Sequence, residues 1–265
     1  MSKKEMKKRI VVKVGTSTLT HKTGKTNIAR MAKLASVLSD LKNAGNEVVL
    51  VSSGAIAVGS VKLGFKSKPT TTQGLQASAA VGQCELMFLY DKLFSEYSVV
   101  VSQLLFSADT LENPQETGHL IDTFNQLLEY DALPIINEND SVYVEELLNG
   151  DNDCLSAKVA TLIGADLLIL LTDTDGLYND NPSKNPDAKL ISRVDEINDE
   201  IFAIAGDAGE KGTGGFATKI KAAKIATDKG IPVVVMNGEK PTDLYKVLDG
   251  QSIGTYFSAK GEQNA

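Results

Sequence analysis

The feature of this sequence that most constrains its fold is the regular alternation of short apolar runs with longer amphipathic stretches. The apolar runs are nearly continuous and rich in β-branched residues, which is typical of strands buried on both faces of a parallel sheet. Alternating β and α patterns predict an α/β fold, in which an open, mostly parallel central sheet lies between helices as a three-layer αβα sandwich. The predicted strands are RIVVKV (9–14), EVVLVS (47–52), VVVSQLLF (99–106), LPIIN (133–137), DLLILLT (166–172) and PVVVM (232–236).

Helical periodicity is present in the segments between these strands. In residues 28–45 apolar side chains recur at helical spacing, and Gly45 supplies a stop signal. The segments 73–97, 216–230 and 241–250 show the same pattern. The residues predicted to form one face of the first helix are Ile28, Met31, Leu34, Ala35, Leu38 and Leu41.

The sequence contains no internal repeat, low-complexity segment or linker, so we expect one domain. With 265 residues, 42% of them hydrophobic, the chain is long enough to bury a sizeable core. The domain is expected to span residues 1–257, and the remaining residues, 258–265, are expected to form a disordered tail.

Charge and the N-terminal residues narrow the class of protein. The formal net charge of −7 argues against a nucleic-acid or anionic-membrane partner. The basic start MSKKEMKKR precedes only the short apolar run IVVKV, which is too brief for a signal peptide or a membrane span. We therefore expect a soluble cytoplasmic protein. Cys84 and Cys154 lack CxxC spacing, and we expect two buried thiols rather than a disulfide.

Common ligand-binding motifs fit the chain poorly. TGKT (23–26) resembles the end of a P-loop, but the first P-loop glycine is missing. GTGGFA (212–217) matches a dinucleotide-binding fingerprint, yet the residues before it favour a helix and loop over a strand. A nicotinamide oxidoreductase would require a strand directly before GTGG. Only His21 and His119 are available for a Ser-His-Asp triad, and neither adjoins a nucleophile signature.

Small and polar residues gather after the predicted strands instead. They form the segments GTSTLT (15–20), SSGAIAVG (52–59), NENDSV (137–142) and DTDGLYNDNP (173–182). Ligands of open α/β sheets bind outside the carboxyl ends of the strands. These segments are therefore the expected site.

Two lysines in this region can be interpreted either as ordinary solvent-exposed residues or as ligand-binding residues. Lys13 lies within an apolar strand, where it could reach water at a strand end or could face a ligand. Lys219 follows the loop GEKGTGG at the first turn of a helix. A cation is unfavourable beside the positive end of a helix unless an anion is bound, so we expect Lys219 to contact a phosphate.

The stretch NGDNDCLSAKVA (149–160) places three polar residues just before a predicted helix. One of Asp151, Asn152 and Asp153 is expected to cap that helix. Asp153 could hold cationic side chains or magnesium, and Asn152 could bind a polar substrate.

Seven segments, taken in order, resemble the glutamate 5-kinases of the amino-acid kinase superfamily. They are VKVGTST, VSSGAIAVG, AAVGQ, INENDSV, NGDNDCLSA, LTDTDGLY and GTGGFATK. The resemblance covers residues 9 to 257 and implies the amino-acid kinase fold. It also implies ATP-dependent phosphorylation of the L-glutamate γ-carboxylate to L-glutamate 5-phosphate, the first step of proline biosynthesis.

The resemblance also assigns roles to particular residues. The expected catalytic residues are Lys13 and Lys219, which neutralise charge on the transferring phosphoryl group, and Asp153, which organises them. The expected ATP-binding residues are Lys13, Gly15, Thr172, Asp173, Thr213, Gly214, Gly215, Phe216, Ala217, Thr218 and Lys219. The expected substrate-binding residues are Ser53, Gly54, Asn137, Asp140 and Asn152.

This reaction suits a chain that is poor in histidine. A glutamate γ-carboxylate has a reference pKa of about 4.3, so it is an anionic nucleophile at neutral pH and requires no general base. The resemblance further implies Mg²⁺ entering with ATP, proline as a feedback inhibitor and a homo-oligomer, a dimer or a tetramer. It assigns no metal ligands. Many bacterial members carry a PUA domain after the kinase domain, and this chain ends before one.

Two alternatives remain open beside the oxidoreductase. The chain could be another member of the superfamily that acts on a different carboxylate or phosphate. It could also be a catalytically silent regulatory relative, although every charged position that the family requires is present.

Overall fold

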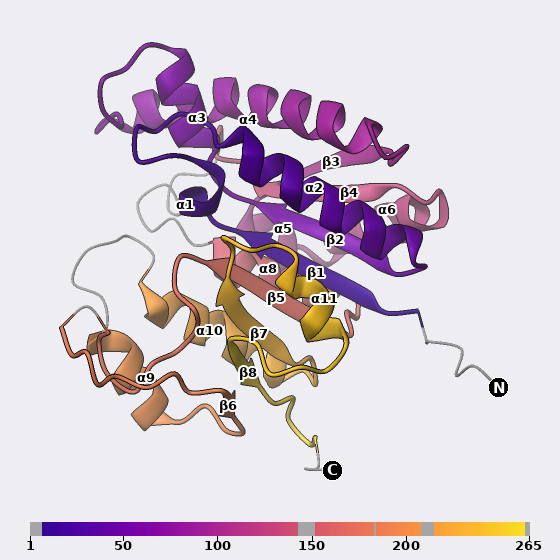
Figure 1. Ribbon diagram of the computed structural model, residues 1–265. Coiled ribbons are helices and arrows are strands. Elements are labelled where there is room, and N and C mark those ends of the chain that lie inside the picture. The colour runs from indigo at the N-terminus through magenta and orange to yellow at the C-terminus, as the bar shows by residue number, and fades with distance from the viewer. Residues whose placement is uncertain (1–6, 143–151, 183, 208–214, 263–265) are drawn as a thin grey trace.

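The computed structural model describes residues 7–142, 152–182, 184–207 and 215–262 (Figure 1). Within these residues an eight-stranded sheet has the order β3-β4-β2-β1-β5-β7-β8-β6. Neighbouring strands are parallel except for β7 and β8, which are antiparallel. The strands are β1 (Arg9–Val14), β2 (Glu47–Ser52), β3 (Val101–Phe106), β4 (Leu133–Glu138), β5 (Leu167–Thr172), β6 (Arg193–Val194), β7 (Val233–Asn237) and β8 (Thr255–Phe257).

Helices cover both faces of this sheet, which confirms the three-layer αβα sandwich (Figure 1). One layer contains α2 (Ile28–Asn43), α3 (Ala55–Lys62), α4 (Thr72–Ser95) and α11 (Asp243–Leu248). The other contains α6 (Pro114–Glu129), α8 (Asn152–Leu162), α9 (Asp199–Asp207) and α10 (Phe216–Thr227). The short helices α1 (Thr16–Leu19) and α5 (Ala108–Glu112) follow β1 and β3. In the described part of the chain no helix is both long and apolar enough to cross a bilayer.

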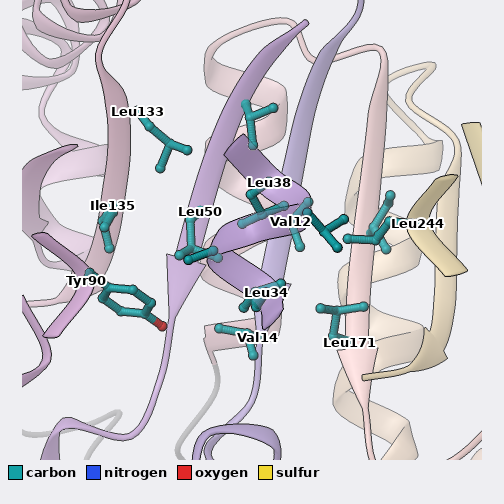
Figure 2. Close-up of a cluster of buried hydrophobic side chains, with 14 of the residues drawn as sticks. Val12, Val14, Leu34, Leu38, Leu50, Tyr90, Leu133, Ile135, Leu171 and Leu244 are labelled. Atoms are coloured by element: carbon teal, nitrogen blue, oxygen red, sulfur yellow. The ribbon is translucent and has the colours of Figure 1, made fainter. Parts of the chain in front are cut away.

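The two faces of β1 contribute to two separate cores. Val12 and Val14 pack with Leu34 and Leu50 against the α2 layer (Figure 2). Val11 belongs to the core on the opposite face, beneath α8 and α10. Because successive side chains of a strand alternate between faces, the side chain of Lys13 lies on the α8 and α10 side. A lysine in the middle of the sheet therefore reaches a layer from which water is largely excluded.

The helix α2 shows how local signals and packing cooperate. The side chain of Asn27 caps its start by accepting a hydrogen bond from the backbone N–H of Arg30. Gly45, at φ +102°, follows its end in the left-handed conformation that glycine adopts most readily. Of the six residues predicted to form its apolar face, five are buried, but Ile28 is 48% exposed. Ile28 is the first residue of the helix.

Some sequence-based predictions are corrected at the periphery of the sheet. β3 is an edge strand, so its side chains are mostly half-buried or exposed, and the prediction of burial on both faces is wrong for it. The sequence analysis missed β6 and β8, because strands of two and three residues carry no readable alternation. Cys84 and Cys154 form no disulfide, as predicted, but Cys84 is exposed and Cys154 is half-buried.

Hydrogen bonds anchor the chain beyond β8. The hydroxyl of Ser258 donates to Asp195, and the hydroxyl of Tyr256 donates to the carboxylate of Glu262. The backbone N–H of Lys260 donates to the carbonyl of Thr227. The residues after Glu262 lie outside the described part of the chain.

Candidate active site

The site lies where the carboxyl ends of the central parallel strands meet. β2 pairs with one edge of β1 and β5 pairs with the other, so the chain order reverses at β1. A reversal of this kind opens a crevice at the carboxyl ends of the strands. The predicted segments 15–20, 52–59, 137–142 and 173–182 begin at or directly after the carboxyl ends of β1, β2, β4 and β5.

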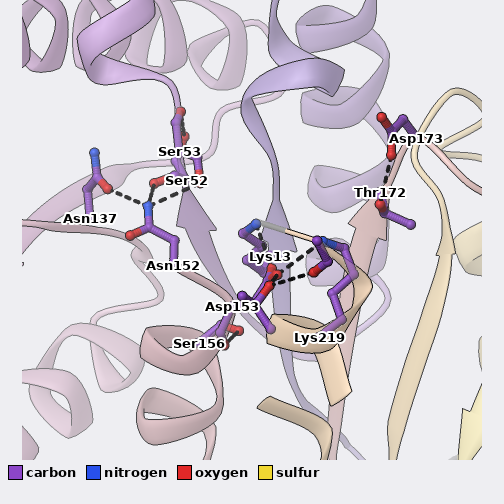
Figure 3. A network of polar contacts seen from close by, with 12 residues as sticks. Lys13, Ser52, Ser53, Asn137, Asn152, Asp153, Ser156, Thr172, Asp173 and Lys219 are labelled. Carbon is purple, nitrogen blue, oxygen red and sulfur yellow. Dashed lines mark hydrogen bonds and ion pairs between the residues drawn. The ribbon is translucent and has the colours of Figure 1, made fainter. Parts of the chain in front are cut away.

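Three charged side chains meet beside the carboxyl end of β1 (Figure 3). Lys13 Nζ lies 2.6 Å from Asp153 Oδ1, and Lys219 Nζ lies 3.1 Å from Asp153 Oδ2. The hydroxyl of Thr218 donates to the same Oδ2 at 2.9 Å. One carboxylate therefore bridges two ammonium groups.

The charges of this cluster are buried and do not balance. Lys13, Asp153 and Lys219 are 7%, 3% and 9% exposed. Burial raises the pKa of the Asp153 carboxyl, but Lys13 and Lys219 outweigh burial and lower its pKa to about 2. Two ammonium groups and one carboxylate leave one net positive charge. Because an unbalanced buried charge is costly, the cluster is suited to receive an anionic group.

Two helix starts position the cluster. Asp153 lies in the first turn of α8, where its carboxylate interacts favourably with the helix dipole. Lys219 lies in the first turn of α10, as predicted, where the dipole disfavours a cation. Asp153 supplies an anion at this position from within the protein. The placement of Lys219 therefore has a structural cause in addition to any bound phosphate.

The structure corrects two details of the sequence analysis here. Asn152 and Asp153 are the first two residues of α8, whereas the pattern placed them just before the helix. Lys13 does not reach water at a strand end, because β1 is central and the cluster holds its ammonium. Asp151 lies outside the described residues.

On the β2 and β4 side of the cluster, the carboxamide of Asn152 connects the ends of these two strands (Figure 3). Asn152 Nδ2 donates to the carbonyl of Ser52 at 3.0 Å, to Ser53 Oγ at 3.1 Å and to Asn137 Oδ1 at 2.8 Å. Asn137 Nδ2 in turn donates to Gln83 Oε1 at 2.8 Å. The predicted Ser53, Asn137 and Asn152 are therefore brought together, and Gln83 joins them. Sequence analysis did not single out Gln83, although it ends the segment AAVGQ.

Gly54 and Asp140 lie close in sequence to residues of this network: Gly54 follows Ser53, and Asp140 lies three residues after Asn137. Gly54 is the N-cap of α3 and has a φ of +99°, a conformation that disfavours other residues. Asp140 is half-buried in the turn that follows β4. Asn152 itself contacts Ser53 after β2 and Asn137 within β4.

On the β5 side, Thr172 ends the strand and Asp173 follows it (Figure 3). The Thr172 hydroxyl donates to Asp173 Oδ1 at 3.2 Å. Gly15 follows β1 and lies beside the Lys13 ammonium, since a Cβ there would lie 3.7 Å from Lys13 Nζ, an ordinary contact distance. The cluster therefore lies between an amide-rich side and a threonine- and aspartate-lined side.

The glycine loop is only partly described. Gly215 is the N-cap of α10, and Phe216 and Ala217 follow half-buried in its first turn. Thr213 and Gly214 lie outside the described residues. The last element described before the loop is the helix α9, which ends at Asp207, and among the described residues that precede the loop no strand of the kind that a dinucleotide fingerprint requires follows this helix. This observation counts against the oxidoreductase alternative.

Solved structures share this architecture at low identity. A UMP kinase from Bacillus anthracis superimposes with a TM-score of 0.65 at 16% identity, covering 96% of this chain and 97% of that one. A T. acidophilum isopentenyl phosphate kinase gives a TM-score of 0.60 at 19% identity, covering 94% of this chain and 99% of that one. These similarities establish the fold alone.

Curated relatives are far more similar. Glutamate 5-kinase of Clostridium perfringens is 52% identical over 258 residues, which are 96% of this chain and 96% of the relative. Glutamate 5-kinase of Enterococcus faecalis is 44% identical over 268 residues, covering 99% of both chains. The family model described as "Amino acid kinase family" matches residues 8–237. With this match and these relatives along nearly its whole length, the chain belongs to the amino acid kinase family and, within it, to the glutamate 5-kinases.

Proposed function

We propose that this protein transfers the γ-phosphoryl group of ATP to the γ-carboxylate of L-glutamate, giving L-glutamate 5-phosphate and ADP as the first step of proline biosynthesis. The observation that carries the proposal is the buried cluster of Lys13, Asp153 and Lys219, with its one net positive charge. Bringing an anionic carboxylate to a polyanionic nucleotide requires positive charge at the meeting point. The cluster supplies that charge in a region of low exposure, where its effect on a transition state is largest.

In this proposal the nucleotide occupies the β5 side of the cluster. Lys13, Gly15, Thr172, Asp173 and the loop at residues 213–219 bind ATP, with Lys13 and Lys219 at the transferring phosphoryl group. Backbone N–H groups at the start of α10 and the small Gly15 support close approach of phosphate oxygens. Asp153 holds both ammonium groups in position.

L-Glutamate occupies the β2 and β4 side, where Ser53, Gly54 and Asn152 border it. The carboxamide of Asn137 is bonded to Asn152 and Gln83, so it orients Asn152 rather than reaching far into the site. Asp140 pairs with the α-ammonium, because a desolvated charge requires an opposite partner. The reacting γ-carboxylate then points toward the cluster on β1.

We propose that Mg²⁺ enters this site with ATP. Among the described residues no group of three His, Cys, Asp or Glu side chains is placed to hold a metal ion. The phosphate oxygens of ATP are suitable ligands for Mg²⁺, which usually keeps several waters and few protein ligands. When bound, the ion would neutralise phosphate charge.

Three further properties belong to the same proposal. Proline shares the ammonium and carboxylate of glutamate, so it is proposed as a feedback inhibitor that competes for the same pocket. The protein is proposed to act in the cytoplasm and to form a homo-oligomer, a dimer or a tetramer. Exposed apolar side chains, Phe88 at 62% and Val100 at 66%, are compatible with burial against a second copy.

A parallel assay of acceptors tests the proposed reaction. ATP consumption is measured with L-glutamate, L-aspartate, N-acetyl-L-glutamate and UMP under identical conditions. The proposal expects turnover with L-glutamate that exceeds turnover with each of the others at least tenfold in kcat/KM. Preference for another acceptor would mean that the protein acts on a different substrate within the superfamily. Absence of turnover with all four acceptors would favour a catalytically silent regulatory relative.

A further inference from the structure

The amide network does not end at the residues that sequence analysis assigned to the substrate. Gln83, on α4, accepts a hydrogen bond through Oε1 from Asn137 Nδ2 at 2.8 Å. It is half-buried, and within the described residues this is the one side-chain hydrogen bond of its carboxamide. Its amide nitrogen donates to no acceptor in that part of the chain.

Backbone groups fix the direction of every hydrogen bond in this network. The carbonyl of Ser52 can only accept, so the Asn152 atom 3.0 Å away is the amide nitrogen. The backbone N–H of Glu138 can only donate, so its partner at 3.0 Å in Asn137 is the amide oxygen.

The orientation of Gln83 follows from these two assignments. The Asn137 oxygen receives Asn152 and the Glu138 N–H, so the Asn137 nitrogen faces Gln83. Gln83 must therefore present its oxygen to Asn137 and turn its NH₂ group away. The outermost group of the network is therefore the NH₂ group of Gln83, which is a hydrogen-bond donor.

Within the hydrogen-bond network Gln83 is the member farthest from the charged cluster, since Asn152 adjoins Asp153 and Gln83 is reached through Asn137. The reactive cluster lies on β1, while the network extends from Asn152 across the ends of β2 and β4 to α4. A glutamate whose γ-carboxylate lies at the cluster presents its α-carbon, with an ammonium and a carboxylate, toward that end. An NH₂ group is a donor and matches the carboxylate of the two.

We propose that Gln83 is a specificity-determining residue whose carboxamide NH₂ donates to the α-carboxylate of the substrate. The assignment rests on the proposed function, since it takes the reacting carboxylate to lie at Lys13, Asp153 and Lys219. It adds to that function a requirement for a free α-carboxylate.

The variant Gln83→Glu replaces the NH₂ group of this side chain and keeps the oxygen that faces Asn137. A carboxylate oxygen still accepts from Asn137, so the inward contact is kept, whereas the outward donor becomes a negatively charged acceptor. We expect the KM for L-glutamate to rise at least tenfold, while the KM for ATP and kcat at saturating glutamate change less than about twofold. Gln73→Glu is the matched control, because Gln73 is exposed in the first turn of the same helix and receives the same change.

A substrate analogue distinguishes binding from a structural role. In the α-amide of L-glutamate the γ-carboxylate is unchanged, but the α-carboxylate is replaced by a carboxamide that can donate. The wild-type protein is expected to use the α-amide at least tenfold less efficiently than glutamate in kcat/KM, and Gln83→Glu is expected to lose or invert that preference. Gln83→Ala, which carries neither donor nor acceptor, should lose it too and serves if Gln83→Glu does not fold.

The outcomes separate the two proposals. An unchanged glutamate KM in Gln83→Glu, or an equal penalty for both substrates, would overturn the assignment of Gln83 while leaving the kinase function intact. Absence of any glutamate phosphorylation by the wild-type protein would instead overturn the proposed function, and this assignment with it.

Discussion

Asp153 is in contact with two ammonium groups and can neutralise one of them. Removing either lysine leaves a neutral pair, in which Asp153 keeps one ion-pair partner and the hydroxyl of Thr218. Removing Asp153 instead leaves two buried ammonium groups facing each other. The three residues should therefore differ sharply in whether their loss affects turnover or stability.

The lysine variants should lower turnover. We expect Lys219→Ala and Lys13→Ala each to reduce kcat by roughly 10²-fold or more, because each removes one preorganised charge contact to the transition state. Steady-state kinetics with Lys221→Ala as control measures this, since Lys221 is exposed on the same helix, α10. A near-normal kcat in either variant would remove that lysine from phosphoryl transfer.

The aspartate variant should lower stability in a pH-dependent way. The pKa of Asp153 is lowered to about 2, so its stabilising effect is present above the unfolded-state pKa and is lost as the pH falls from roughly 4 toward 2. We expect Asp153→Asn to lower the free energy of unfolding at pH 7 by about 3–5 kcal/mol, because two buried charges lose their partner. Denaturant titrations at pH 7 and pH 3 should show this difference shrinking at the lower pH.

The same substitution at an exposed ion pair provides the comparison for Asp153. Asp228 pairs with Lys224 on the surface of α10 at 3.1 Å, and Asp228→Asn should cost less than about 1 kcal/mol. A difference at Asp153 as small as this, or one that does not change with pH, would contradict the assigned charge balance.

The sequence was sufficient to identify candidate residues of this site, but it did not show which of their side chains contact one another. Lys13 was recognisable as a lysine in an apolar strand, and Lys219 as a cation at a helix start. That both contact Asp153 depends on how β1, α8 and α10 pack, which periodicity does not encode. Gln83 carried no signal of its own, because a glutamine on a long helix resembles any surface residue.

At the scale of elements, α3 and α4 cross with their backbones in contact. A Cβ at Gly59 would lie 1.8 Å from the carbonyl oxygen of Ser78, and a Cβ at Gly82 would lie 1.8 Å from that of Ala55. Neither glycine has a positive φ, so space rather than conformation requires them. This crossing also positions Gln83, the residue after Gly82, whose carboxamide contacts Asn137 on β4.

Widening that crossing should destabilise the protein. We expect Gly59→Ala to lower the free energy of unfolding by about 3 kcal/mol or more, because the helices must separate to admit a methyl group. Gly118→Ala on α6 is the matched control: nothing lies within 4 Å of the position that its added methyl group would take, and the change should be neutral or stabilising by up to about 1 kcal/mol. Urea titration of both variants decides the matter, and a Gly59→Ala protein as stable as wild type would show that the crossing tolerates a side chain.

The central elements were more predictable than the peripheral ones. β1, β2 and β5 are buried on both faces, and such strands read as continuous apolar runs. β3 has the same type of sequence but lies at the edge of the sheet. Its position could not be predicted, because the sequence of one strand does not determine the order of the strands in the sheet. The helices α3 and α4 touch through glycines, whose role becomes visible only when both backbones are placed.

For the whole molecule, three groups of polar side chains lie at the carboxyl ends of neighbouring strands of the sheet. The amide network lies at the ends of β2 and β4, the charged cluster at β1, and Thr172 and Asp173 at β5. Solved structures with 16% and 19% identity share this architecture. In the proposed reaction phosphoryl transfer occurs at the cluster on β1, and we expect the side chains on the β2 and β4 side to select the acceptor.

The most direct test of this account follows the oxygen atoms of the acceptor. L-Glutamate labelled with ¹⁸O in its γ-carboxylate is incubated with ATP and the protein in the presence of hydroxylamine, which attacks the acyl carbon of an acyl phosphate and releases phosphate. If the γ-carboxylate attacks the γ-phosphorus, γ-glutamyl hydroxamate should form in step with ADP, and the released phosphate should carry one ¹⁸O atom. Phosphate without the label, or ADP without hydroxamate, would mean that water or another group accepts the phosphoryl group and would contradict the account.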